Sequence, residues 1–436
     1  MNTTDWLNIP VAKVYGRLTK VNGLMLEAIG CRLAIGDRCH IECKDSSKVE
    51  AEVVGFYNST LCLMPVTHTP RLLPGARVIP LENTAKIPIG NGLKGRVLDG
   101  LGNPLDDLGP LTNVSYCQPE SRIPNPLKRL PITQKLDVGV RVINGLLPVG
   151  RGQRVGVFAG PGVGKSVLLG MMTRFTEAEI IVVGLIGERG REVREFIEDA
   201  LGEEGRKKSV VITAPADTPP LMRMRAMRLC HQIAAQYRDE GKQVLLLVDS
   251  LTRYAQAQRE IALTLGEPPA TKGYPPSAFA QLPSLVEMAG NGEHISGTLT
   301  AFYTVLAEGD DQQDPIADAA RAILDGHFVL SRKLAESGHF PAIDVNASVS
   351  RLASQITSAD ELKQISRIRG LLAKYREVQE LLPLGGYQSG HDLELDIAVR
   401  NYPLISEYLK QNQHDSFSIE DSTEQLSELL SIIDNN

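Results

Sequence analysis

Alternating apolar and polar positions mark the first part of the chain. In residues 48–56, KVEAEVVGF, apolar residues at every second position alternate with two glutamates, which predicts a half-buried strand. Asn22 and Gly23 separate two further strand-like runs and favour a tight hairpin, because both positions of such a turn take positive φ. Several short strands with turn residues between them predict a small β-barrel or sandwich.

From about residue 97 the pattern changes to nearly continuous runs of Val, Ile and Leu, each followed by a helical segment. These runs are residues 155–159, 180–187, 210–216 and 243–250, with a further strand in 294–306. In the helical segment 219–241, Met227, Cys230, Ala234 and Tyr237 fall on one face. Continuous apolar strands separated by helices predict a parallel sheet that is covered on both faces.

Helical periodicity dominates the chain after about residue 355. Ser358 and Glu361 form a capping-box pattern at the start of a long helical segment. Ser422 and Gln425 form a second such pattern, which predicts that a last helix begins there. The C-terminal part is therefore expected to be helical.

Composition narrows the class of protein. A chain of 436 residues has room for two or three domains, and its net charge of −6 argues against a general electrostatic grip on nucleic acid. The N-terminus has no signal-peptide pattern, and no stretch of about 18 apolar residues predicts a membrane span. Any membrane contact is therefore expected to be peripheral or through partners.

The six cysteines are scattered and predict reduced thiols in a cytosolic protein. They are Cys31, Cys39, Cys43, Cys62, Cys117 and Cys230. His40 lies beside Cys39, and Cys43 follows, which would suit a metal site, but no second CxxC-type pair completes it.

Residues 155–169, VGVFAGPGVGKSVLL, have the pattern of a phosphate-binding loop between a strand and a helix. Glycines let phosphate oxygens approach the backbone N–H groups, and the helix dipole adds positive potential. Lys165 would reach the β- and γ-phosphates, and Ser166 would coordinate Mg²⁺. Ala159 stands where the usual pattern has its first glycine. The candidate nucleotide-binding residues are Gly160, Pro161, Gly162, Val163, Gly164, Lys165, Ser166 and Val167.

Hydrolysis needs a metal-holding acid and a group that orients water. Asp249 ends an apolar run, where it would either hold Mg²⁺ or cap the next helix; the phosphate loop favours the metal role. Glu188 follows another apolar run, where it would polarise the attacking water. A salt bridge with Arg189 or Arg191 explains it equally well, and the pattern alone leaves both readings open.

Several long motifs identify a family. GRGQRVGVFAGPGVGKS, GLIGERGRE, LLLVDSLTRYAQAQREIALTLGEPPATKGYPPS and the segment 307–351 closely resemble the flagellar and type III secretion ATPases, relatives of the catalytic subunits of rotary ATP synthases. The resemblance covers nearly the whole chain. Residues 310–318, DDQQDPIAD, look like the flagellar branch.

The resemblance implies a multidomain α/β fold with an N-terminal β-barrel (1–82), a RecA-like ATPase core (83–354) and a C-terminal helical domain (355–436). It also implies ATP hydrolysis with Mg²⁺ in a homohexamer, with nucleotides at subunit interfaces. The catalytic roles would fall to Lys165, Glu188, Arg189, Asp249, Arg253 and Arg351.

Among these residues, Glu188 matches the catalytic carboxylate and Arg189 a phosphate-contacting arginine. Arg253 matches an arginine close to the terminal phosphate. Arg351 matches the arginine finger supplied by the neighbouring subunit, although a surface or interface salt bridge would also explain it.

Two aromatic residues match the adenine site of the family. Phe340 matches the residue that packs on adenine, and a ring beside a nucleobase gains stacking energy. Tyr387 is a second candidate wall, with core packing as an equal alternative.

The implied function is ATP hydrolysis that energises or primes protein export through the flagellar apparatus, in the cytoplasm and peripherally at the inner membrane. Implied partners are a stator-like regulator, a central stalk-like protein, export substrate–chaperone complexes and a membrane export gate. The arm before residue 14 is shorter than the family often has, with Leu7 and Ile9 as its apolar residues. The alternatives are an injectisome ATPase and a non-catalytic subunit of a rotary ATPase. A nucleic-acid motor is disfavoured by the acidic charge and by only one Trp and nine Phe, which give little sign of a stacking platform.

Overall fold

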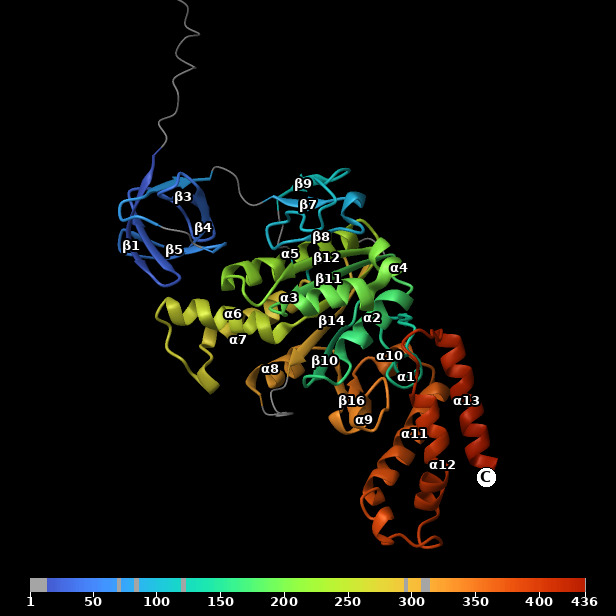
Figure 1. The fold of residues 1–436 in the computed structure, drawn as a ribbon. Coiled ribbons are helices and arrows are strands. Elements are labelled where there is room, and N and C mark those ends of the chain that lie inside the picture. The colour runs from blue at the N-terminus through green and yellow to red at the C-terminus, as the bar shows by residue number, and fades with distance from the viewer. Residues whose placement is uncertain are drawn as a thin grey trace, which may run out of the picture.

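The computed structural model describes residues 14–68, 72–81, 86–118, 123–293, 297–306 and 314–435. Leu7 and Ile9 lie outside these residues. Figure 1 shows three parts in chain order: a small barrel in blue, a large α/β core from cyan to orange, and a helical part in red. The multidomain α/β fold expected from the sequence is confirmed.

A closed barrel of six strands forms the N-terminal part, with neighbouring strands in the order β1-β2-β5-β4-β3-β6. The strands are β1 (Gly16–Asn22), β2 (Met25–Ile29), β3 (Arg38–Glu42), β4 (Lys48–Tyr57), β5 (Thr60–Pro65) and β6 (Arg77–Pro80). Val49, Ala51 and Val53 of β4 point inward and are buried, as the alternation predicts. Closure leaves no sheet edge unpaired, which distinguishes the barrel from a sandwich.

The first hairpin forms where the sequence places it, but its turn is shifted by one residue. Asn22 pairs with Met25 in the ladder, so the two loop residues are Gly23 and Leu24. Gly23 takes a φ of 58°, while Asn22 stays in the strand. A glycine at the first loop position satisfies a type II′ turn, which needs positive φ there alone.

An eight-stranded sheet forms the centre of the core, in the order β16-β15-β10-β14-β13-β11-β12-β8, and every neighbour is parallel except β16 beside β15. The strands are β8 (Val97–Leu98), β10 (Arg154–Ala159), β11 (Ile180–Ile186), β12 (Ser209–Ala214), β13 (Gln243–Asp249), β14 (Thr298–Leu306), β15 (Gly326–Leu330) and β16 (Ile343–Ser350). A small second sheet pairs β7 (Ile87–Ile89) with β9 (Ser115–Cys117).

Both faces of the large sheet are covered, as the continuous apolar strands predict. Val244, Leu246 and Val248 of β13 belong to one buried cluster, whereas Leu245 and Leu247 belong to another. The core helices are α1 (Arg141–Leu146), α2 (Lys165–Phe175), α3 (Gly190–Glu195), α4 (Gly202–Lys207), α5 (Pro220–Asp239), α6 (Leu251–Thr264), α7 (Pro276–Val286), α8 (Pro315–Ile323) and α9 (Arg332–Glu336). Two short 3₁₀ turns are η2 (Asn91–Leu93) and η4 (Thr271–Gly273), and η3 (Phe196–Leu201) is a π-helix between α3 and α4. The predicted apolar face of α5 is buried.

The C-terminal helices are α10 (Ala353–Ile356), α11 (Ala359–Val378), α12 (Leu393–Leu409) and α13 (Ile419–Asn435), with η6 (Leu382–Leu384) between α11 and α12. Ser358 and Glu361 form the predicted capping box. The predicted start of the last helix at Ser422 is wrong, because α13 begins at Ile419 and Ser422 is buried inside it. Ser418 instead exchanges hydrogen bonds with Asp421, so the helix starts one turn earlier.

Ion pairs attach the barrel to the core. Arg225 on α5 donates from Nε to Glu52 at 2.7 Å and lies 3.4 Å from Glu50, both on β4. The predicted boundaries at residues 82 and 354 stay predictions: residues 82–85 lie outside the described chain, and residue 354 falls inside α10. Within the described chain no helix is long and apolar enough to cross a membrane. All six cysteines are free, and the described residues contain no group of three or more His, Cys, Asp or Glu that could hold a metal.

Candidate nucleotide-binding and catalytic site

A strand, a glycine turn and a helix form the predicted phosphate loop. β10 ends at Ala159, α2 begins at Lys165, and the turn between them includes Gly162 and Gly164 at φ values of 76° and 88°. L-residues with a side chain rarely take such angles, so glycine is needed there. The free backbone N–H groups of the turn and of the first residues of α2 form a site that favours an anion, and the dipole of α2 adds positive potential there.

Two carboxylates and one ammonium meet beside this turn. Lys165 Nζ lies 2.7 Å from Asp249 Oδ1 and 3.4 Å from Glu188 Oε1. Asp249 ends β13 and Glu188 follows β11, so adjacent parallel strands deliver both carboxylates to the same edge of the sheet. Thr304 on β14 donates its hydroxyl to Asp249 Oδ1 at 2.6 Å and fixes that carboxylate. The sequence analysis names Lys165, Asp249 and Glu188 as candidates, and the structure brings these three residues together.

Burial and charge act on the same cluster in opposite directions. Burial lowers the pKa of Lys165, but the carboxylates of Asp249 and Glu188 outweigh it, and the net pKa is raised. Burial, and next the Asp249 carboxylate, raise the pKa of Glu188, while Lys165 opposes them. Lys165 therefore keeps its positive charge, and Glu188 is a better proton acceptor than an ordinary glutamate.

Two predicted arginines flank Glu188. A Cβ on Gly187 would lie 2.8 Å from Arg253 Cβ, so this glycine lets the Arg253 side chain pack across the backbone next to Glu188. Arg253 Nη1 donates to Gln256 at 3.0 Å, and its buried Nε has no hydrogen-bond partner in the described chain. Arg189 is the residue directly before α3, and its side chain is 80% exposed and pairs with Glu192. Arg253 is therefore part of the enclosed site, whereas Arg189 lies on its surface.

The aromatic candidates lie in different places. A Cβ on Gly164 would lie 3.3 Å from two ring carbons of Phe340, so this ring sits against the phosphate loop, and Phe340 is 45% exposed. An exposed ring there is available to stack on a base. Tyr387 follows η6 and donates its hydroxyl to Asp396 at 2.5 Å. Among the described contacts none joins Tyr387 to Phe340, and its adenine contact stays a prediction.

A further segment that the sequence did not indicate borders Phe340. The loop between α12 and α13 lines a cavity of about 480 Å³ with Phe340 and Arg141. The backbone N–H of Gln411 donates to the carbonyl of Phe340 at 2.9 Å. The Arg141 guanidinium lies 4.3 Å from the centre of the Phe417 ring. The C-terminal helical part therefore closes one side of the space next to the phosphate loop.

Arg351 lies at the opposite edge of the sheet from its own phosphate loop. It follows β16, whose Ser350 pairs with Gly326 at the start of β15. Gly326 lies beside the first residues of β10, because the next residue, His327, pairs with Gly156. Ala159, where the phosphate loop begins, lies about 13 Å further along β10, since each strand residue adds about 3.3 Å. The Arg351 side chain is exposed and donates to the carbonyl of Arg321 at 2.9 Å. Within one chain, Arg351 is therefore separated from Lys165 and Glu188.

Comparison with known proteins decides the family. Residues 139–350 match the nucleotide-binding domain of the ATP synthase alpha/beta family, and residues 357–428 match the T3SS EscN ATPase C-terminal domain. The flagellum-specific ATP synthase of Pseudomonas aeruginosa is 56% identical over 98% of this chain and 96% of that protein. The chain belongs to the flagellar and type III secretion ATPases.

Solved structures of this export ATPase family agree with the fold. The assembled ATPase EscN of the enteropathogenic E. coli type III secretion system has a TM-score of 0.89 at 40% identity, covering 95% of this chain and all of that one. EscN in complex with its central stalk EscO has a TM-score of 0.87 at 39% identity, with the same coverage. The family and ATPase predictions made from the motifs are confirmed.

Some residues of this export ATPase could not be found from local patterns. Thr304 lies inside an apolar strand, and nothing near it in the sequence marks it as the partner of Asp249. The loop 410–418 has the composition of any polar loop. Both reach the site through the tertiary fold.

Proposed function

We propose that this export ATPase hydrolyses ATP, with Mg²⁺, to energise or prime protein export through the flagellar type III secretion apparatus. The observation that carries the catalytic assignment is the buried Glu188 carboxylate, 3.4 Å from the phosphate-loop lysine. A carboxylate in this position is placed to orient water at the terminal phosphate and to accept its proton. The flagellum-specific relative supports the flagellar branch over the injectisome.

The donor set fits Mg²⁺. The Ser166 hydroxyl, at the start of α2, and the Asp249 carboxylate are hard oxygen ligands of the kind that Mg²⁺ prefers. When bound, the ion would neutralise phosphate charge. Lys165, which pairs with Asp249 and Glu188, would turn toward the β- and γ-phosphates, and Arg253 would meet the terminal phosphate. Phe340 would pack on the adenine ring.

Arg351 would complete the site of a neighbouring subunit. Its place at the opposite edge of the sheet, with an exposed side chain, supports a role between chains and not within one. A guanidinium delivered in trans stabilises charge on the transferring phosphoryl group and is worth roughly 10³–10⁵ in rate in other enzymes. The assembled form of EscN supports a homohexamer in which activity depends on assembly.

The partners follow from the same proposal. The EscN–EscO complex supports a central stalk-like partner for this chain. A stator-like regulator, export substrate–chaperone complexes and a membrane export gate complete the proposed set. The protein would act in the cytoplasm, peripherally at the inner-membrane export apparatus.

The test is the change Glu188→Gln, which removes the proton acceptor at nearly constant size. Steady-state phosphate release should fall roughly 10²–10⁴-fold, because general-base catalysis contributes about that factor. ATP binding, measured by equilibrium titration, should persist.

The control is Glu195→Gln, the same chemical change at an exposed position on α3, where Glu195 pairs with Arg191. It should leave turnover near that of the unchanged protein. Near-normal hydrolysis by the Glu188 variant would reject the catalytic role and favour a non-catalytic nucleotide-binding subunit.

A further inference from the structure

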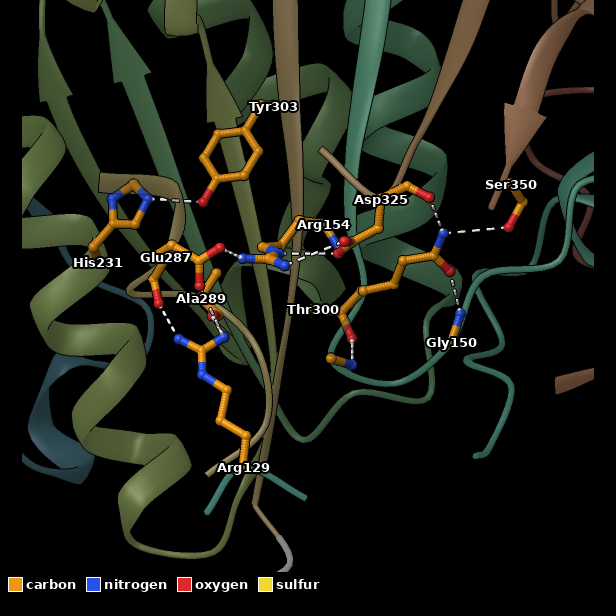
Figure 2. Close-up of polar contacts among 12 residues, drawn as sticks. Arg129, Gly150, Arg154, His231, Glu287, Ala289, Thr300, Tyr303, Asp325 and Ser350 are labelled. Atoms are coloured by element: carbon orange, nitrogen blue, oxygen red, sulfur yellow. Dashed lines mark hydrogen bonds and ion pairs between the residues drawn. The ribbon is translucent and has the colours of Figure 1, made fainter. Parts of the chain in front are cut away.

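Arg154 and Asp325 form a multiply bonded pair, called the Arg154–Asp325 clamp below, which joins the start of β10 to the residue before β15 (Figure 2). This end of the two strands lies opposite the end that carries the phosphate loop. Arg154 donates to Asp325 Oδ2 from its backbone N at 3.0 Å and from Nε at 2.9 Å, and to Oδ1 from Nη2 at 3.2 Å. The backbone N–H of Asp325 donates back to the Arg154 carbonyl at 2.8 Å. Such a multiply bonded guanidinium–carboxylate pair fixes geometry more tightly than a single ion pair.

The same clamp holds the backbone of Arg351. The Asp325 carbonyl accepts from the Arg351 N–H at 3.0 Å and from Gln153 Nε2 at 3.2 Å. Gln153 Nε2 also donates to Ser350 Oγ at 3.2 Å, and that hydroxyl donates to the Pro148 carbonyl at 2.6 Å. Two consecutive residues, Ser350 and Arg351, are therefore tied to the start of β10.

A second layer supports Arg154 from behind. Arg154 Nη1 donates to Glu287, and Arg129 Nη1 lies 3.4 Å from the other oxygen of that carboxylate. Arg129 also donates to the Ala289 carbonyl at 3.0 Å (Figure 2). The Arg154 side chain is only 16% exposed. Burial lowers its pKa, but Asp325 and Glu287 outweigh this effect and raise it, so the guanidinium stays charged.

The backbone around Arg351 is also closely packed. A Cβ on Gly326 would lie 2.6 Å from the Val349 carbonyl oxygen, so only glycine lets β15 approach the end of β16 this closely. By contrast, the Arg351 head group is exposed, and among the described residues one hydrogen bond holds it, to the Arg321 carbonyl near the end of α8. A rigid backbone with an outward guanidinium suits a side chain that enters the site of a neighbouring molecule, because little conformational entropy is then lost when it does so.

We propose that Gln153, Arg154 and Asp325 are positioning residues that hold Arg351 in place for the catalytic site of the neighbouring subunit. This inference rests on the proposed function, in which Arg351 acts in trans. It has a specific consequence. A change in these three residues impairs the neighbour's site, while the phosphate loop of the altered chain remains competent.

Mixed rings test this consequence. Asp325→Asn subunits keep an intact Glu188 but have a loosened Arg351, whereas Glu188→Gln subunits have an inactive site but a well-held Arg351. In a random one-to-one mixture, about a quarter of the head-to-tail interfaces join an intact site to an intact finger. Neither variant alone offers such an interface.

Asp325→Asn alone should lower kcat about 10²-fold, the loss expected from a misplacement of roughly 1 Å, with KM changed less than about twofold. Adding the nearly inactive Glu188→Gln protein should raise activity above the sum of the two. Arg154→Lys keeps the charge but loses the multiple guanidinium contacts with Asp325, so it should behave like Asp325→Asn. It replaces Asp325→Asn in the test if that variant does not assemble. Asp360→Asn, a change at an exposed position on α11, should retain full activity. Ring size is checked by mass measurement.

Arg351→Ala mixed with Glu188→Gln separates the two proposals. If this mixture recovers activity but the mixtures with the Asp325 and Arg154 variants do not, the positioning role is overturned and the trans role of Arg351 stands. The same conclusion follows if this mixture recovers activity and both positioning variants have a normal kcat. No recovery with Arg351→Ala overturns the trans role and the proposed interface site with it. Recovery in all mixtures supports both.

Discussion

A buried histidine should make the core of this protein sensitive to acid. His231 on α5 is fully buried, and its Nδ1 lies 2.8 Å from the Met227 carbonyl, which can only accept a hydrogen bond. Nδ1 therefore carries the proton, and Nε2 accepts from the Tyr303 hydroxyl at 2.9 Å (Figure 2). The neutral ring satisfies both of its nitrogens, and a second proton would break the bond from Tyr303.

The size of the effect follows from the pKa. Burial lowers the pKa of His231 to about 4, whereas an unfolded histidine titrates near 6.5. As the pH falls through 6.5 the unfolded chain takes up the proton first, so the free energy of unfolding decreases between pH 6.5 and 4 and is unaffected by this group above that range. At pH 5 the loss is about 2 kcal/mol, from about 1.4 kcal/mol for each pH unit. For a core of this size, that corresponds to a Tm lower by about 4–8 °C.

The assay is calorimetry of the nucleotide-free protein at pH 7 and pH 5, with His231→Gln as the comparison. Glutamine cannot take up the proton, so the fall in the Tm of the core between the two pH values should be smaller in the variant by about 4–8 °C. Other acid-sensitive groups contribute equally to both proteins and cancel in this difference. An equal fall in both proteins would show that His231 does not carry the effect and would refute the reasoning.

Two further predictions concern the nucleotide. Phe340→Ala should weaken ATP binding about 2–13-fold in an equilibrium titration, because an aromatic contact is worth about 0.5–1.5 kcal/mol. Phe340→Tyr should bind normally, and unchanged affinity in the alanine variant would exclude the ring from the adenine site. Ser166→Ala should raise the Mg²⁺ concentration needed for half-maximal hydrolysis at least about tenfold, since the loss of a mere hydrogen-bond partner of a metal ligand already costs about 10–100-fold in affinity or activity and Ser166 is proposed as a direct ligand. An unchanged Mg²⁺ activation curve would contradict that ligand role.

Local sequence determines the secondary elements and the phosphate loop of this protein. The run 243–249 predicts a buried strand, because residues on both of its faces are apolar and only a sheet covered on both sides accommodates them. Gly162 and Gly164 predict the loop because positive φ is a property of single residues. Lys165 and Asp249 could be assigned because each stands directly at the end or the start of such an element. Glu188 became a candidate for the same reason, but its position left two readings open, and only the family resemblance favoured the catalytic one.

Tertiary contacts decide the remainder, since they join residues that no local pattern connects. Two successive capping patterns, Ser418 with Asp421 and Ser422 with Gln425, occur near the start of the last helix, and the structure uses the first. Ser422 lies inside the helix, where its carbonyl accepts a hydrogen bond from the Tyr408 hydroxyl on α12, a contact that no local pattern predicts. Thr304 reaches Asp249 only because β14 lies next to β13. Arg351 lies away from its own phosphate loop because β16 runs antiparallel to β15. Strand order and direction depend on the packing of the whole core. The local sequence identifies candidate residues, but this long-range packing determines which of their side chains lie together.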